Sequence, residues 1–90
     1  MISVSNEAAC LIRELVNNAG LPEGAGLRIA QRDDHTALAM TLTEQPSYHD
    51  TVLIEKNAPV FLGPAALDRV QGQTLDANST DTAAAFYLRD

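Results

Sequence analysis

The chain has 90 residues and a net charge of −6 at pH 7, from six Lys and Arg against twelve Asp and Glu. This length predicts a single domain spanning residues 1–90 with a small core. The acidic balance argues against nucleic-acid binding, which depends on clustered Lys and Arg. No apolar run reaches the roughly 20 residues of a membrane span, and the N-terminus has no signal-type segment. The single cysteine, Cys10, cannot form an intramolecular disulfide, which favours a cytoplasmic location.

The first predicted element is an amphipathic helix over residues 6–19. Ser5 is a suitable N-cap, and Glu7 lies in the first turn near the positive end of the helix dipole. Gly20 and Pro22 follow the last helical residue and predict its end. The apolar residues recur at helical spacing and form one stripe: Ala8, Leu11, Ile12, Leu15, Val16 and Ala19.

From Leu27 the apolar period changes from helical to two, which predicts strands. Apolar residues alternate with other residues in two segments, 27–32 and 37–43. These segments are joined across Asp33 and Asp34, which predicts a hairpin. After a loop at 44–50, Val52 and Ile54 mark a third strand. We expect a turn at residues 57–58 and a fourth strand at 60–62.

The rest of the chain predicts one short helix and two further strands. Pro64 suits the first position of a helix that ends at Gly72. Leu75 marks a short strand, residues 78–81 form a polar turn, and alternation at 84–88 predicts a final strand. The expected fold is α+β, a mostly β, sandwich-like core with one long N-terminal helix and one short helix. Its predicted β core contains Leu27, Ile29, Leu38, Met40, Val52, Ile54, Val60, Leu62 and Phe86.

Several short motifs share one order and spacing with a known family. They are Val4-Ser5 before the first helix with Ile12-Arg13-Glu14-Leu15 inside it, Gly26-Leu27-Arg28-Ile29, Asp50-Thr51-Val52, Val60-Phe61-Leu62, Gly72-Gln73-Thr74-Leu75-Asp76 and Ala85-Phe86. Through these motifs the chain resembles the A-type iron–sulfur carriers, the HesB/IscA-like family. The resemblance implies a HesB-like domain and self-association, since members commonly form dimers or tetramers.

The chain departs from this family where the family's chemistry lies. Members hold iron or a cluster through three cysteines, one in a Gly-Gly-Cys-Ser-Gly turn and two in a Cys-Gly-Cys-Gly tail. Here the turn reads Arg32-Asp33-Asp34-His35-Thr36-Ala37, and the sequence reaches Asp90 before any such tail. One cysteine at a different position cannot replace three thiolates, so we expect no iron–sulfur cluster.

The same turn offers a different candidate metal site. His35 stands where the family has its first cysteine, and imidazole and carboxylate are good ligands for zinc or iron, so Asp33, Asp34 and His35 are candidate ligands. His49, the other histidine, could add a second imidazole if the two loops meet, with Asp33 or Asp50 beside it. The alternative, which we favour, is an exposed polar hairpin tip and a solvated loop histidine, because three adjacent residues rarely converge on one ion.

Cys10 falls opposite the apolar stripe on a helical wheel, on the polar face with Glu14 and Asn17. An outward cysteine is unusual, since free cysteine is among the most buried residue types. It could mark a partner contact or an intermolecular disulfide. The reading we favour is a tolerated small residue, or one buried under a second subunit.

No enzyme constellation is present, since the chain lacks a Gly-x-Ser-x-Gly elbow and a phosphate-binding loop. The leading hypothesis is therefore a non-catalytic HesB-like scaffold that has lost the cluster ligands. It would act as a binding or interaction protein linked to iron–sulfur assembly, with a protein partner or a second copy and no cofactor. Two alternatives stay open: an iron- or zinc-binding protein using His35 and its acidic neighbours, and a residual carrier whose missing ligands come from a partner.

Overall fold

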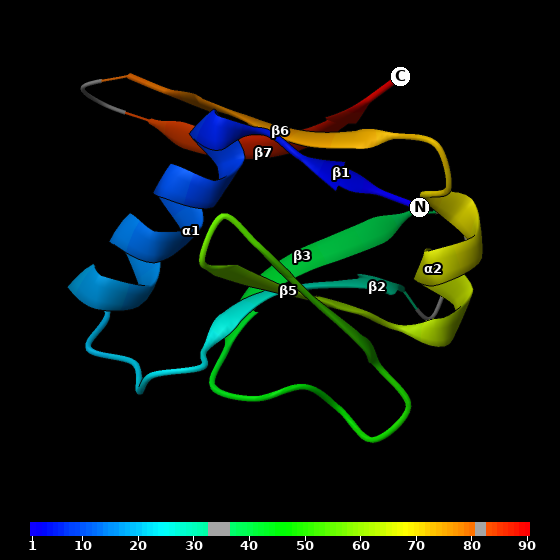
Figure 1. The fold of residues 1–90 in the computed structure, drawn as a ribbon, viewed down its shortest axis with the longest axis horizontal. Helices are drawn as coiled ribbons and strands as arrows, with labels where there is room; N and C mark the ends of the chain where they lie inside the picture. Colours follow the sequence, from blue (N-terminus) through cyan, green and yellow to red (C-terminus); the bar gives the residue numbers. More distant parts are fainter. Residues whose placement is uncertain (33–36, 81–82) are drawn as a thin grey trace.

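The computed structural model describes residues 1–32, 37–80 and 83–90. Two sheets and two helices make up this part of the chain, so the predicted α+β class is confirmed. In Figure 1 the sheets form two layers, with α1 and α2 at opposite sides of the molecule. The elements in chain order are β1 (Ser3–Val4), α1 (Asn6–Asn18), β2 (Gly26–Gln31), β3 (Leu38–Thr43), β4 (Thr51–Glu55), β5 (Ala58–Leu62), α2 (Pro64–Arg69), β6 (Thr74–Ser79) and β7 (Ala84–Arg89).

The first sheet has the strand order β1-β6-β7, and the second has the order β3-β2-β5-β4. In the second sheet, β2 pairs antiparallel with β3 and parallel with β5. The predicted hairpin strands are therefore confirmed as β2 and β3. The expected tip at Asp33 and Asp34 lies outside the described residues.

Helix α1 begins and ends close to where the sequence predicts. The Ser5 side chain accepts a hydrogen bond from the Ala8 amide at 3.0 Å, which makes Ser5 the N-cap. Ala19 is the C-cap, so the helix is one residue shorter than expected. Its buried residues are Ala8, Ala9, Leu11 and Ile12. The apolar stripe is less buried toward the C-terminus of the helix, where Leu15 and Val16 are partly buried and Ala19 is exposed.

The main core lies between the two sheets and is closed by both helices. Leu27 and Ile29 from β2 and Val60 and Leu62 from β5 form its floor, each at most 2% exposed. Leu75 of β6 is fully buried above them. The other buried members of this cluster are Ile2, Val4, Ala8, Ala9, Leu11, Ile12, Ala58, Ala66, Val70 and Ala77. Leu38, Met40 and Phe86, predicted as core, are partly buried and pack against the cluster.

The prediction for the third strand is wrong about which face of β4 is buried. Val52 and Ile54 were expected in the core, yet they are 45% and 69% exposed. Leu53 instead packs against the core, because it pairs with the buried Val60 and cross-strand partners share a face. Val52 pairs with Phe61, which is buried on the opposite face of the sheet.

The predicted turn at residues 57–58 is also wrong by one residue. Lys56 and Asn57 have φ values of 53° and 65°, and Glu55 pairs with Ala58. Two consecutive left-handed residues make a two-residue type I′ turn, whose twist suits a tight hairpin. Ala58 is fully buried and opens β5.

Three further boundaries differ from the sequence-based expectation. Val4 forms a short parallel pair with Leu75 that was not predicted. The first two residues of the expected polar turn, Asn78 and Ser79, belong to β6. Helix α2 ends at Arg69 rather than at Gly72, with Pro64 in its first turn as predicted. No helix in the described part of the chain is long and apolar enough to cross a membrane.

Candidate functional site

The predicted metal site stays a prediction, because three of its four candidate ligands, Asp33, Asp34 and His35, lie outside the described residues. His49 is exposed in the loop before β4, and its ring makes an edge-on contact with Tyr48 at a centroid distance of 4.4 Å. Within residues 1–32, 37–80 and 83–90, no three His, Cys, Asp or Glu side chains are placed to hold one ion.

Asp50, which follows His49, forms an ion pair with Arg28. Its carboxylate accepts hydrogen bonds from Nε and one Nη of Arg28 at 2.7 and 2.9 Å, and from the Ser47 amide at 2.9 Å. The side chain of Asp50 is 1% exposed. The hydrogen bond from Arg28 is the main cause that lowers the pKa of the Asp50 carboxyl, and it outweighs the opposing effect of burial. Asp50 therefore anchors the loop to the outer face of β2 and is not available to a metal beside His49.

Cys10 lies on the exposed side of α1, as its place on the helical wheel predicts. Its Sγ is 4.0 Å from a carboxylate oxygen of Glu14. The thiol lines a hollow of about 390 Å³ between α1 and β6. The other lining residues are Glu7, Leu11, Glu14, Ala77, Asn78 and Ser79. The hollow therefore places one thiol between two acidic side chains, with no second thiol beside it in the described chain.

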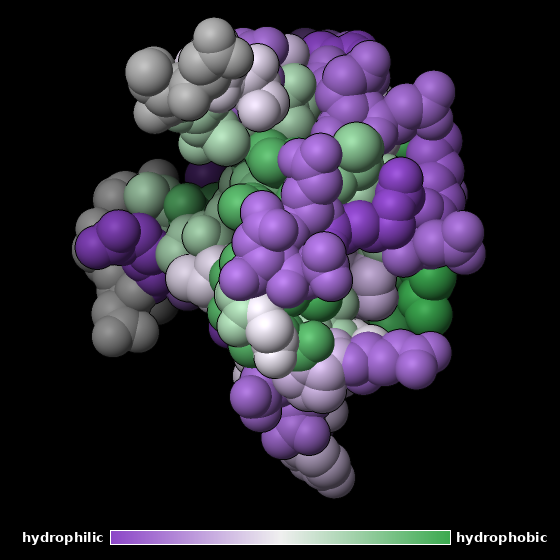
Figure 2. Space-filling model, turned by 90° about the vertical axis from the view of Figure 1, so that its left-hand side faces the viewer, coloured by the Kyte–Doolittle hydropathy of each residue, from purple (hydrophilic) through white to green (hydrophobic). Residues whose placement is uncertain are grey.

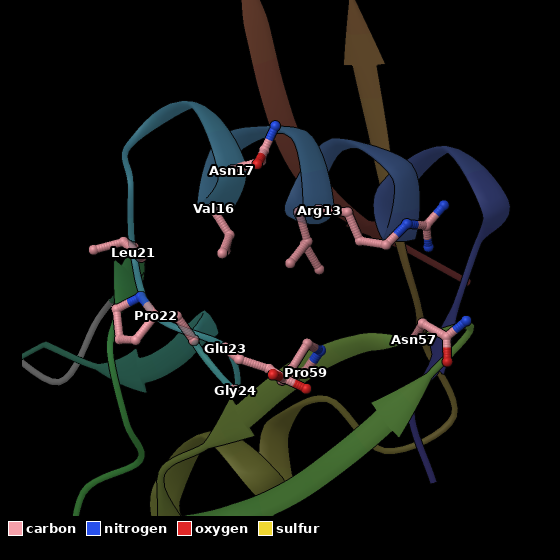
Figure 3. A pocket seen from close by; sticks show the side chains of 11 residues that line it. Arg13, Val16, Asn17, Leu21, Pro22, Glu23, Gly24, Asn57 and Pro59 are labelled. Atoms are coloured by element: carbon pink, nitrogen blue, oxygen red, sulfur yellow. The ribbon is translucent and has the colours of Figure 1, made fainter.

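A second concave site lies under the C-terminal half of α1, and we call it the α1 groove. Its volume is about 230 Å³. Figure 3 shows Val16 pointing from α1 toward the strand that carries Pro59. The lining residues are Ile12, Arg13, Val16, Asn17, Leu21, Pro22, Glu23, Gly24, Ala25, Asn57 and Pro59.

The end of α1 builds one wall of the α1 groove. The amide of Leu21 donates to the Val16 carbonyl and that of Gly20 to the Asn17 carbonyl, both at 3.1 Å. Gly20 has a φ of 68°, which completes a Schellman motif. The motif places Leu21 and Val16 at the same end of the α1 groove, where both residues line it.

A tight turn and a close strand contact build the opposite wall. The Ala25 amide donates to the Pro22 carbonyl at 3.1 Å, and Gly24 has a φ of 92°, as a type II turn requires. The next glycine, Gly26, touches β5: a Cβ built there would lie 2.2 Å from the Pro59 carbonyl oxygen. The glycine that opens the Gly-Leu-Arg motif is therefore a requirement of packing between β2 and β5.

Polar contacts fix the end of the α1 groove at the type I′ turn. Arg13 donates from its guanidinium to the Lys56 carbonyl, and the Lys56 amine donates to the Val4 carbonyl at 2.7 Å. These two bonds tie the turn to α1 and β1. Asn57 therefore lies at a fixed position at the groove's rim, where a second hollow of about 400 Å³ also uses Arg13 and Asn57.

The α1 groove combines apolar and polar lining. Its floor is apolar, and its rim carries one cation, one anion and two amides. Its volume lies below the roughly 300–1,000 Å³ of sites for drug-sized ligands. The surface on the α1 side is mostly hydrophilic, with small hydrophobic areas (Figure 2). The α1 groove therefore suits a single apolar side chain.

Sequence reasoning did not identify the residues that shape these sites. Asp50 was considered as part of a motif and as a metal ligand, and Arg28 as part of a motif, although their pairing fixes the loop. The Lys56–Asn57 turn carried a weak signal, since Asn tolerates left-handed backbone but Lys does not favour it. Nothing in the local sequence indicates that Arg13 reaches the Lys56 carbonyl, a contact between residues far apart in the chain.

Several proteins of known structure have the same fold as this chain. No family model and no curated protein matches the chain. The structure is similar to Escherichia coli SufA, involved in biosynthesis of iron–sulfur clusters, with a TM-score of 0.79, 21% identity, and coverage of 99% of this chain and 84% of SufA. A protein from Aquifex aeolicus, solved by NMR, matches with a TM-score of 0.78 at 21% identity, and the match covers 99% of this chain and 90% of that protein. IscA with a [2Fe–2S] cluster matches with a TM-score of 0.75 at 17% identity, and the match covers 100% of this chain and 85% of IscA. The chain therefore has the HesB/IscA-like fold that its motifs imply.

Proposed function

We propose that this chain is a non-catalytic binding protein that uses the carrier fold in the cytoplasm, linked to iron–sulfur assembly but holding no cluster through its own thiols. The observation that carries the proposal is the fold. It matches SufA, a protein of iron–sulfur cluster biosynthesis, and IscA, solved with a [2Fe–2S] cluster, over 99% and 100% of this chain.

The count and position of thiols support the loss of the cluster. A [2Fe–2S] cluster is commonly held by four cysteine thiolates, whereas the chain has one cysteine. Cys10 lies on the outer side of α1, about 4.0 Å from an acidic oxygen of Glu14. Several copies would have to bring this face together around one cluster, against repulsion between their carboxylates.

The α1 groove supports binding to a protein rather than to a metabolite. Its volume of about 230 Å³ accepts one apolar side chain. Its walls are fixed by the end of α1, by the type II turn before β2 and by the contact between β2 and β5. A rigid pocket that receives one anchoring side chain is a common centre of a protein–protein contact. We infer that a partner in cluster assembly inserts such a side chain beneath Val16.

Anaerobic reconstitution tests the loss of the cluster. The purified protein is incubated with ferrous iron, sulfide and thiol, passed through gel filtration, and analysed for iron, sulfide and visible absorbance. The proposal predicts no stoichiometric iron or sulfide in the protein peak. The matched variant is Cys10→Ser, because a cluster present in the wild type and absent from this variant would show ligation by Cys10 and contradict the proposal.

A second candidate function is zinc or iron binding at the turn after β2. It is favoured by the place of His35 at the family's first cysteine position, between two paired strands. The Arg32 amide donates to the Ala37 carbonyl at 3.0 Å, so the described residues on both sides of the turn lie together. Titration calorimetry with Zn²⁺ or Fe²⁺ decides it. Binding at the turn predicts heat that His35→Ala abolishes and that weakens below about pH 6.5, where an unperturbed histidine protonates. Equal heats in wild type and variant exclude the turn.

A further inference from the structure

We propose that β4 is a self-association edge, through which two copies of this chain pair their β4 strands antiparallel about a twofold axis at Leu53. This pairing would join the two four-stranded sheets into one continuous sheet. The inference concerns a surface that the proposed function does not use, since the α1 groove and Cys10 lie elsewhere.

The edge of β4 is open and apolar. Among the described strands, β4 is the last of its sheet and pairs only with β5. Val52 is 45% exposed and Ile54 is 69% exposed, and both are β-branched residues that favour strand pairing. Native proteins usually protect an open edge with charged residues, Pro, a bulge or a very short strand. Residues 51–55 contain no Lys or Pro, β4 pairs with β5 without a bulge, and the one charged residue, Glu55, lies at the end of the strand next to the turn.

The type I′ turn determines which backbone groups of β4 point outward. A two-residue turn makes its flanking residues, Glu55 and Ala58, a hydrogen-bonded pair. Hydrogen bonding alternates along an antiparallel strand, so Glu55, Leu53 and Thr51 direct their backbone groups to β5. Val52 and Ile54 direct theirs to the open edge.

One antiparallel register satisfies all of these outward groups. With the twofold axis at Leu53, Val52 of each copy lies opposite Ile54 of the other, and the two residues exchange both of their hydrogen bonds. The exposed side chains of the same residues then pack across the axis, which removes the apolar surface from water. A strand that satisfies itself in this way fits a second copy of the same chain.

The charges of β4 are compatible with this register. Glu55 of each copy lies opposite Thr51 of the other, so no like-charged side chains face each other within the strand. Each copy carries a net charge of −6, which opposes association at long range. The paired strands are short, so the contact falls at the small end of specific interfaces. We therefore expect a concentration-dependent dimer that tightens with salt.

Sedimentation velocity with the full chain tests the surface. Raising the salt from about 0.15 M to 1 M shortens the Debye length from about 8 to 3 Å, and the dimer fraction should rise. Ile54→Lys places two amines in each interface and should weaken association by at least roughly tenfold. The matched control is Tyr48→Lys, which makes the same change at a side chain 92% exposed in the neighbouring loop. It should leave the dimer intact.

Disulfide trapping in a Cys10→Ser background tests the register. Two copies of residue 53 would form a non-hydrogen-bonded pair with a Cα separation of about 4.5 Å, within the range of a disulfide. Leu53→Cys should therefore give a covalent dimer on mild oxidation. Glu55→Cys should not, because the two copies of residue 55 lie about 14 Å apart in this register.

Circular dichroism confirms that each variant is folded before association is measured. A protein that stays monomeric at high concentration and high salt would overturn the proposal. A dimer that Ile54→Lys leaves unchanged, or covalent dimers that form equally at residues 53 and 55, would also overturn it.

Discussion

Gly26→Ala should destabilise the protein severely, although it adds only one methyl group. Gly26 opens β2 where this strand passes closest to β5. The added Cβ would lie 2.2 Å from the Pro59 oxygen, 2.7 Å from its Cβ and 2.8 Å from its carbonyl carbon. Two of these three atoms belong to the backbone of a paired strand, so no side-chain rotation relieves the contact.

The size of the effect follows from the required movement. Cβ contacts below 3.0 Å are essentially never seen, and the added Cβ would lie 2.2 Å from the Pro59 oxygen. The two strands must therefore move apart by about 0.8 Å to bring this contact to 3.0 Å. Overpacking of this kind costs about 1–3 kcal/mol, and a weakened ladder hydrogen bond between β2 and β5 adds about 0.5–1.5 kcal/mol. We expect a loss of about 2–4 kcal/mol in the free energy of unfolding.

Urea denaturation of Gly26→Ala and Gly63→Ala measures this effect against a matched control. A Cβ at Gly63 would meet its nearest atom, a guanidinium nitrogen of Arg28, at 3.4 Å, which is an ordinary contact. Its unfolding free energy should change by less than about 1 kcal/mol, because the reduced freedom of the unfolded chain offsets a small steric cost. Equal midpoints for the two variants would refute the reasoning about the Pro59 contact.

Two further predictions concern α1 and the loop before β4. Ile12→Ala should lower the free energy of unfolding by about 3–5 kcal/mol, because Ile12 is fully buried. Leu15→Ala should lower it by roughly 1–2 kcal/mol, because Leu15 is only partly buried. Equal losses for the two variants in a urea titration would show that α1 packs differently. Arg28 lowers the pKa of Asp50 in the folded protein. The ion pair therefore stabilises the fold fully above about pH 3.9, the pKa of an Asp in the unfolded chain. This contribution is lost as the pH falls through the pKa of Asp50 in the folded state. The stability advantage of wild type over Asp50→Asn should therefore shrink below about pH 4, and a difference that does not change with pH would contradict this.

The sequence predicted α1 well because several independent signals agree there. Ser5 caps the start and Gly20 takes the left-handed conformation at the end. The apolar stripe has only one helical phase, so the buried face follows directly. The errors lie at the C-terminal end, where the helix is one residue shorter than predicted and Ala19 is exposed.

The same reasoning failed at β4 because its pattern has two readings. Val52, Leu53 and Ile54 are all apolar, so alternation does not show which face is buried. The type I′ turn at Lys56 decides it by pairing Leu53 with Val60. Asn57 is a weak signal for this turn, but left-handed Lys is rare, so the sequence did not predict the turn at Lys56.

The candidate sites were harder to predict than the fold. The α1 groove is made by segments far apart in the sequence, and its rim depends on the contact between Arg13 and the Lys56 carbonyl. The exposed position of Cys10 was predicted, because it follows from helical phase alone. The candidate ligands Asp33, Asp34 and His35 lie outside the described residues, so their role stays a prediction.

Iron and sulfide content after anaerobic reconstitution is the most direct test of the central claim that this chain uses the carrier fold without a cluster of its own. E. coli SufA, which shares the fold at 21% identity, is treated in the same batch to provide the comparison. The account predicts that this chain leaves gel filtration with no stoichiometric iron or sulfide. Retention of both by the wild type, with loss of both in Cys10→Ser, would contradict it.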